Sequence, residues 1–278
     1  MSTPSAPRPG GAAAAWLGGL SPRRRLLVAG IALLVAAGAV VAGVAASGGD
    51  ASTATGYPPQ NRPGPVLLVP GYGGQTGSLS ALAARIRSTG RQATVVHLPG
   101  NGTGSLIADA SVLNAAVTRA LQGGAPSVDV IGYSAGGVAT LLWVREDGGV
   151  HKARRVVTLG SPFHGASIAS AAQGFVPGAC PAACQQLVPG SSLLSRLDAT
   201  PVPARPRWLS LWSTDDTTVT PPDSARLAGA INVPIQSVCP AQRISHSQLP
   251  VSPVVTAMVL QAIGPGPVRP PAASDCRA

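Results

Sequence analysis

The chain has 278 residues, a length that suits one larger domain with an added segment. Hydrophobic residues make up 45% of it and charged residues only 11%, so it can bury a core and is not disordered throughout. The formal net charge is +10, which permits attraction to an anionic surface such as a membrane or cell wall. Basic and aromatic residues are not interleaved and no nucleic-acid motif occurs, so we exclude nucleic acid as a partner.

The N-terminal part differs from the rest of the chain. Residues 1–25 are rich in small residues and Pro and end in three arginines, which predicts a disordered cytoplasmic tail. Residues 26–46 carry no charge and are long enough for the roughly 20 apolar residues that span a bilayer, so we expect a transmembrane anchor. Arginines precede this segment and none follows until Arg62, which predicts a single-pass protein with its main domain outside the cytoplasm. A cleaved signal sequence, and hence secretion, is the alternative.

All four cysteines follow the apolar segment, as expected for a domain in an oxidising compartment. We expect two disulfides, Cys180–Cys184 and Cys239–Cys276, while the sequence alone leaves the other pairings open. A zinc site needs clustered ligands, and the CPAAC stretch has no partner cluster. We therefore expect neither a metal ion nor another cofactor.

Strand-like and helix-like patterns alternate after a linker at 47–63. Apolar runs predict six strands, at 65–71, 93–100, 127–133, 154–162, 207–213 and 233–239. Helical spacing predicts four main helices, at 77–90, 105–124, 135–147 and 252–263. Residues 163–203 interrupt the alternation, hold a short helical piece, and are expected to pass over the sheet. The order predicts an α/β domain at 64–263, a mostly parallel, doubly wound sheet with helices on both faces. A Pro-rich tail at 264–278 follows.

The sequence GYSAG at 132–136 follows a predicted strand and begins a predicted helix. This is the context in which G-x-S-x-G forms a sharp turn that presents its serine, here Ser134, as a nucleophile. Side chains at Gly132 or Gly136 would collide with neighbouring backbone in such a turn. For an isolated motif, a helix start with Ser134 as its N-cap is the alternative interpretation.

A nucleophilic serine needs a base, and the base needs an acid that orients it. In a sheet of this type the three follow the order Ser, acid, His. Of the four histidines only His246 lies near the end of the chain, before the last predicted helix. Asp215 and Asp216 directly follow a predicted strand, where the acid is expected. The sequence therefore predicts a catalytic triad of Ser134, one of these two aspartates, and His246.

The loop PGYGG at 70–74 follows the first predicted strand and suits an oxyanion hole. We expect the backbone N–H groups of Tyr72 and Ala135 to face the developing negative charge. His164, in the segment after the fourth strand, is interpreted either as a pocket residue or as a residue that positions its loop.

Taken together, the motifs VPGYGG, VIGYSAGG, TLGSPFHGA, STDDTTV and SHSQL resemble the bacterial triacylglycerol lipases and esterases of the α/β-hydrolase superfamily. The resemblance covers residues 64–263. In that family a Val follows the acid by three positions, which selects Asp216, with Val219, over Asp215. This chain departs from the family at two positions. It has Pro70 before Gly71 where members often have His, and it has Tyr133 where members often have His or another residue. Both departures leave the triad intact and affect the expected shape of the pocket.

The sequence thus predicts an extracytoplasmic serine carboxylic-ester hydrolase that forms an acyl-enzyme on Ser134. Its expected partners are a lipid or small ester substrate and the membrane, through the N-terminal helix, and we expect a monomer. Two alternatives stay open. The same triad serves acyltransferases and amide or thioester hydrolases, and a relative without activity would be a cell-envelope binding protein.

Overall fold

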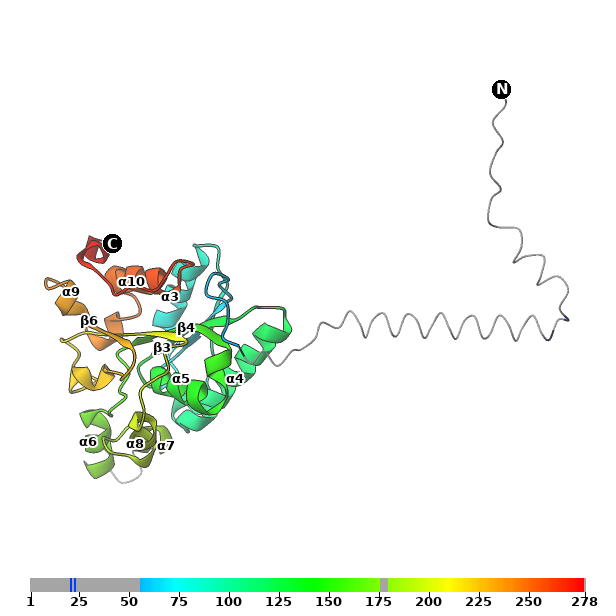
Figure 1. The fold of residues 1–278 in the computed structure, drawn as a ribbon. Coiled ribbons are helices and arrows are strands. Elements are labelled where there is room, and N and C mark those ends of the chain that lie inside the picture. The colour runs from blue at the N-terminus through cyan, green and yellow to red at the C-terminus, as the bar shows by residue number, and fades with distance from the viewer. Residues whose placement is uncertain (1–20, 22, 24–55, 176–179, 278) are drawn as a thin grey trace. The chain divides into compact units, whose positions relative to one another are not determined.

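The computed structural model describes residues 56–175 and 180–277, together with residues 21 and 23 (Figure 1). The predicted anchor at 26–46 lies outside the described residues. Within them, no helix has the length and apolar character needed to cross a membrane. Residues Ala54–Ala278 form one compact unit.

The centre of this unit is a single sheet in which every neighbouring pair of strands is parallel. The spatial order is β2-β1-β3-β4-β5-β6, so the chain starts near one edge, adds β2 there, and then extends to the other edge. The strands are β1 (Val66–Val69), β2 (Ala93–Val95), β3 (Val128–Tyr133), β4 (Ala153–Leu159), β5 (Arg207–Trp212) and β6 (Ile231–Pro234). The predicted six-stranded parallel sheet is confirmed.

Helices cover both faces of the sheet: α3 and α10 lie on one face and α4 and α5 on the other (Figure 1). The α-helices are α3 (Gly77–Arg87), α4 (Leu106–Gln122), α5 (Ala135–Glu146), α6 (Ser167–Phe175), α7 (Ala182–Gln186), α8 (Ser192–Asp198), α9 (Ile235–Val238) and α10 (Pro253–Ile263). Short 3-10 helices are η1 (Pro99–Gly102), η2 (Gly149–His151), η3 (Pro222–Ala225), η4 (His246–Gln248) and η5 (Ala273–Arg277).

The central strand β1, VLLV, is an unbroken apolar run because both of its faces are buried. In β1, Leu67 and Val69 join the core beneath α4 and α5, whereas Val66 and Leu68 join the core beneath α3 and α10. Successive side chains of a strand point to opposite faces, so one short run supplies two hydrophobic cores.

Three segments differ from the predicted elements. The strand predicted at 93–100 ends at Val95, and its last two positions belong to η1. The strand predicted at 233–239 ends at Pro234, and the chain turns there into α9 because the Gln236 side chain binds the loop after β5, accepting from the Thr214 N–H and donating to Ser213 Oγ. The excursion at 163–203 contains α6 and α7 in addition to the predicted helical piece, which is α8.

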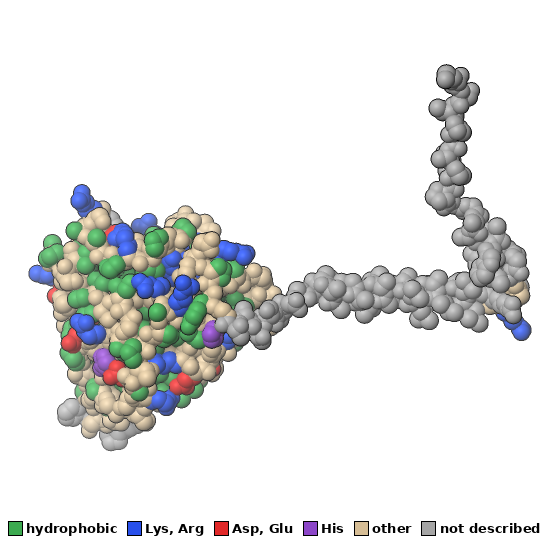
Figure 2. Space-filling model, viewed as in Figure 1, with side chains coloured by type: hydrophobic (Ala, Val, Ile, Leu, Met, Phe, Trp, Pro, Cys, Tyr) green, Lys and Arg blue, Asp and Glu red, His purple; other side chains and the backbone are tan. Residues whose placement is uncertain are grey.

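Both predicted disulfides are confirmed. Cys180–Cys184 lies beside α7, and Cys239–Cys276 ties the C-terminal tail to the loop after α9. The tail therefore ends in η5, which packs on α10. Basic side chains are spread over the face of the domain that Figure 2 shows, with hydrophobic and polar ones between them, and do not gather into one stripe there.

Candidate active site

Ser134 lies in the turn between β3 and α5, with backbone angles of φ 53° and ψ −128°. A positive φ is unusual for a residue with a side chain, and strain of this kind is common where a side chain must be presented for chemistry. A Cβ at Gly132 would lie 2.5 Å from the Gly137 Cα, and one at Gly136 would lie 2.3 Å from the Val69 oxygen. Both glycines are therefore needed for the turn, as expected. Ser134 occupies the N-cap position of α5, but its side chain makes no capping bond, so helix capping does not account for the serine.

His246 begins η4, and its Nδ1 lies 2.6 Å from Oδ2 of Asp216. The other carboxylate oxygen, Oδ1, accepts the N–H groups of Thr218 and Val219, each at 2.9 Å. Both the imidazole and the carboxylate are buried, with side-chain exposures of 9% and 1%. Bonding at Nδ1 leaves Nε2 as the ring nitrogen that faces away from the acid.

Asp215, the competing acid, points elsewhere. Its Oδ2 lies 3.4 Å from the Gln236 side-chain nitrogen and 3.9 Å from that of Arg243. Its side chain is 37% exposed. The structure therefore brings Asp216, and not Asp215, to the imidazole.

Ser134 and His246 line the same cavity, whose volume is about 390 Å³. No hydrogen bond joins their side chains within residues 56–175 and 180–277, and such bonds are often long until a substrate is bound. Gly71 closes one side of the serine, since a Cβ there would lie 2.8 Å from the Ser134 Cβ. The cavity is lined by Gly71, Tyr72, Gln75, Tyr133, Ser134, Pro162, Ala166, Ile168, Ala169, Ala172, Cys184, Leu187, Thr218, Val219 and His246.

The two N–H groups expected in an oxyanion hole come from the loop after β1 and the first residue of α5. In the hydrogen-bond network of the described residues, neither the Tyr72 N–H nor the Ala135 N–H has an acceptor. Their loops flank the serine, because Gly71 contacts it and Ala135 follows it. Free N–H groups on either side of a nucleophile can bind an oxyanion.

No protein-family model and no curated protein matches this sequence. Solved structures do match. Lipase B of Aspergillus fumigatus superposes with a TM-score of 0.62 at 17% identity, over 78% of this chain and 56% of that lipase. The mature lipase BlEst2 of Bacillus licheniformis superposes with a TM-score of 0.52 at 18% identity, over 64% of this chain and 84% of that lipase. This chain has the α/β-hydrolase fold. It spans little more than half the length of the fungal lipase.

In this α/β-hydrolase fold, Tyr133 does more than line the cavity. Its hydroxyl donates to the backbone oxygen of His246 at 3.2 Å, and the two rings lie 5.0 Å apart between centroids. Burial, with a smaller effect from the charge of Asp216, raises the pKa of Tyr133 to about 12. The phenol therefore stays neutral and holds the loop that carries the imidazole. The sequence did not reveal this, because it depends on a backbone oxygen 113 residues away.

His164 lies outside the cavity lining, which corrects its interpretation as a pocket residue. Its Nδ1 is 3.5 Å from the Asp198 carboxylate and its Nε2 is 3.0 Å from the Arg226 oxygen. The ring connects the start of the excursion to α8 and to the chain after η3. These contacts agree with the other interpretation, in which His164 positions its loop.

The apolar half of the cavity comes from residues of the excursion at 163–203. They belong mainly to α6 and α7 and the residues beside them: Ala166, Ile168, Ala169, Ala172, Cys184 and Leu187. The available signal was the uncharged stretch SIASAAQGF, in which positions 168, 169 and 172 share one helical face.

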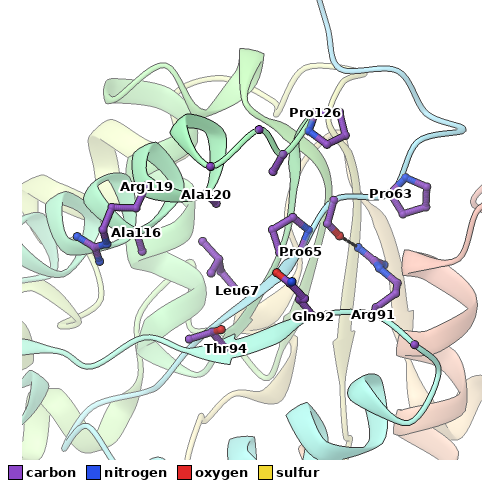
Figure 3. Close-up of a pocket in the computed structure, with 15 residues that line it drawn as sticks. Pro63, Pro65, Leu67, Arg91, Gln92, Thr94, Ala116, Arg119, Ala120 and Pro126 are labelled. Carbon is purple, nitrogen blue, oxygen red and sulfur yellow. Dashed lines mark hydrogen bonds between the residues drawn. The ribbon is translucent and has the colours of Figure 1, made fainter.

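A larger cavity, of about 680 Å³, lies at the amino ends of β1 and β2, next to the last turns of α4 (Figure 3). Its lining has no carboxylate, imidazole or thiol. Arg91, at its rim, donates to the Gly64 carbonyl, which also lines the cavity (Figure 3). The larger cavity is therefore not the candidate active site, and the reacting groups lie in the smaller one. Within the described part of the chain, no cluster of His, Cys, Asp or Glu has the arrangement of a metal site.

Proposed function

We propose that this protein is a serine carboxylic-ester hydrolase that works through an acyl-enzyme on Ser134. The observation that carries the proposal is the strained Ser134 turn in the same cavity as a buried Asp216–His246 pair. A nucleophile, a base and an acid that orients the base are the minimum set for acyl transfer from an ester.

In the proposed reaction, Ser134 Oγ attacks the ester carbonyl carbon while His246 Nε2 accepts the hydroxyl proton. Asp216 holds the Nδ1–H and stabilises the imidazolium that forms. The N–H groups of Tyr72 and Ala135 bind the oxyanion of the tetrahedral intermediate. The C–O bond to the alcohol then breaks, and the imidazolium gives its proton to the leaving oxygen. Water, activated by the same imidazole, releases the acid and restores Ser134.

The cavity supports a lipid or other hydrophobic ester as the substrate. Beside the triad its lining is mostly aliphatic, with Ile168, Ala172 and Leu187 among the contacts. Apolar contacts of this kind favour an acyl chain, whereas the polar groups gather where the ester would react.

We also propose that the enzyme acts outside the cytoplasm, held at the membrane by residues 26–46. The uncharged segment and the arginines before it support an anchor. Two disulfides support an oxidising compartment. Protease added to intact cells should digest the domain while the N-terminal tail stays protected. Release of the domain into the medium would instead favour a cleaved signal.

The activity is tested with p-nitrophenyl esters from acetate to palmitate, using the full chain in detergent beside Ser134→Ala. Hydrolysis that disappears in the variant, with one fluorophosphonate bound per chain at Ser134, is the expected result. Folded protein that neither hydrolyses these esters nor reacts with the fluorophosphonate would overturn the proposal. A labelled Ser134 without ester hydrolysis would point to acyl transfer or to amide or thioester cleavage.

A further inference from the structure

The Cys180–Cys184 disulfide forms part of the cavity in which Ser134 lies. Cys184 lines that cavity, and both cysteines are buried, with exposures of 7% and 6%. The sulfur atoms of the two cysteines each lie 3.9 Å from the backbone oxygen of Ala169, which also lines the cavity. The disulfide therefore packs directly against α6 at the level of the pocket.

The pocket side formed by Ala166, Ile168, Ala169, Ala172, Cys184 and Leu187 is called the α6–α7 wall below. Two backbone hydrogen bonds hold this wall. The Ala166 N–H donates to the Leu187 oxygen at 3.1 Å, and the Ala183 N–H, near the start of α7, donates to the Thr103 oxygen at 3.3 Å. The α7 helix has only five residues, and no side chain caps its start. So short a helix has little stability of its own, and its place depends on these bonds and on the disulfide.

The two disulfides of this chain differ in what they constrain. Cys180–Cys184 joins residues 4 apart in sequence, whereas Cys239–Cys276 joins residues 37 apart. The stabilisation that a disulfide gives through the unfolded state grows with the length of the loop it closes. The shorter link thus contributes less to global stability, and its main physical effect is local, on the wall beside Ser134.

The cavity has room for an acyl group. A water-sized group takes about 30 Å³ in a condensed phase. A cavity of 390 Å³ then holds on the order of a dozen such groups. The reacting ester group fills several of these places beside Ser134 and His246, and the rest of the space can hold methylene groups of the acyl chain.

We propose that the Cys180–Cys184 disulfide preorganises the α6–α7 wall as the binding surface for the acyl chain, and so determines acyl selectivity. The inference rests on the proposed ester-hydrolase activity. A wall that is already in place gains binding energy from each methylene it buries, without first having to be ordered. Without the link, part of that gain is lost in ordering the wall, and long chains lose more than acetate does.

The test compares the full chain with two paired variants, Cys180→Ala/Cys184→Ala and the matched control Cys239→Ala/Cys276→Ala. The readout is the ratio of kcat/KM for p-nitrophenyl octanoate to that for the acetate. The first pair should lower this ratio by about fivefold or more, because kcat/KM for the octanoate falls further than that for the acetate. The control pair should leave the ratio within about twofold although it lowers the melting temperature more. An unchanged ratio in a folded first pair, or equal losses in both pairs, would overturn the inference.

Two further measurements keep the test decisive. If the first pair does not fold, the control pair is assayed with and without tris(2-carboxyethyl)phosphine, because Cys180–Cys184 is then the disulfide left to reduce. The octanoate preference should fall on reduction, and a constant preference in fully reduced protein would overturn the inference.

Ester hydrolysis and wall function are separated with methyl- and octylphosphonate p-nitrophenyl esters, which react once with Ser134. If wild type labels but hydrolyses nothing, the proposed function fails, while a labelling preference for octyl that requires the disulfide still supports the wall.

Discussion

Both oxygens of the Asp216 carboxylate have defined partners. Oδ2 meets the His246 imidazole, and Oδ1 accepts the N–H groups of Thr218 and Val219. These bonds give a physical reason for the spacing between the acid and the Val three residues later. The backbone curls around the carboxylate and fixes the direction in which the second oxygen points. The preceding carboxylate, Asp215, is instead contacted by the side chains of Gln236 and Arg243.

This arrangement predicts different effects for two adjacent aspartates. Asp216→Asn replaces the acceptor that fixes the imidazole tautomer, and should lower kcat for ester hydrolysis by about 10⁴, as for serine hydrolases in general. Asp215→Asn, the matched control, changes a carboxylate on the surface and should stay within about threefold of wild type. Steady-state kinetics of the two purified variants measure both effects. A large loss in the Asp215 variant, with Asp216→Asn active, would reassign the acid.

At the scale of the element, the C-terminus of α10 depends on two adjacent arginines of β4. Arg154 and Arg155 are buried inside the sheet layer, with exposures of 0% and 2%. Their guanidinium groups donate to carbonyls at and beyond the end of α10, those of Ala262, Ile263, Gly264 and Gly266. The last carbonyls of a helix lack partners within the helix and carry its negative dipole end, so cations suit them.

Charge balance in this region depends on one buried carboxylate. Asp129 of β3 pairs with Arg154 and, at 2.8 Å, with Arg91. Burial, followed by the repulsion of Arg154, lowers the pKa of Arg155 to about 10. Three arginines thus share one acid in a dry environment, with helix carbonyls in place of further carboxylates.

We therefore expect Asp129→Asn to be strongly destabilising. It leaves Arg154 buried without an opposite charge, a change that typically costs about 3–5 kcal/mol. Urea unfolding monitored by tryptophan fluorescence measures the loss, and Asp223→Asn, at an exposed carboxylate, is the control. A loss below about 1 kcal/mol would mean that the helix carbonyls alone balance the arginines.

At the scale of the whole molecule, the sheet could be predicted because its central strands are buried on both faces and carry runs of apolar residues. The two helices of the α6–α7 wall could not, because α7 is five residues long and starts without a side-chain cap. Its position follows from a disulfide and from contacts with residues far away in sequence. Likewise the strand predicted at 233–239 starts two residues after the start of β6 and ends five residues after its end, since the side-chain bonds of Gln236 that turn the chain at Pro234 are tertiary contacts.

The candidate site also has a part that the sequence predicted and a part that only the structure reveals. His246 was identified because few histidines occur in the chain, and Ser134 because glycines surround it. The support that Tyr133 gives to His246, and the place of His164 against Asp198, depend on which loops meet in space. Residue order therefore predicted the reacting groups, whereas their supporting contacts required the fold.

One carboxyl group links the stability of the whole domain to pH. Asp109, in the first turn of α4, is 2% exposed, and its Oδ1 has no hydrogen-bond partner in the described residues. The helix dipole favours an acid there by up to about 1 kcal/mol. Burial opposes this and prevails, raising the pKa of Asp109 from 3.8 to about 6. The folded protein thus binds a proton on Asp109 more tightly than the unfolded chain does.

The sign of the pH effect follows from that difference. Between pH 3.8 and about 6 the folded state holds more protons at Asp109, so rising pH lowers the free energy of unfolding across this range. The loss approaches about 3 kcal/mol once the group is ionised in both states. Asp109→Asn removes this titration, so it should raise the melting temperature at pH 8 and have a progressively smaller effect toward pH 4. Calorimetry of both proteins over that range, with Asp223→Asn as the control, measures it. A stabilisation that is the same at pH 4 and pH 8 would show that the variant acts through packing and not through the charge.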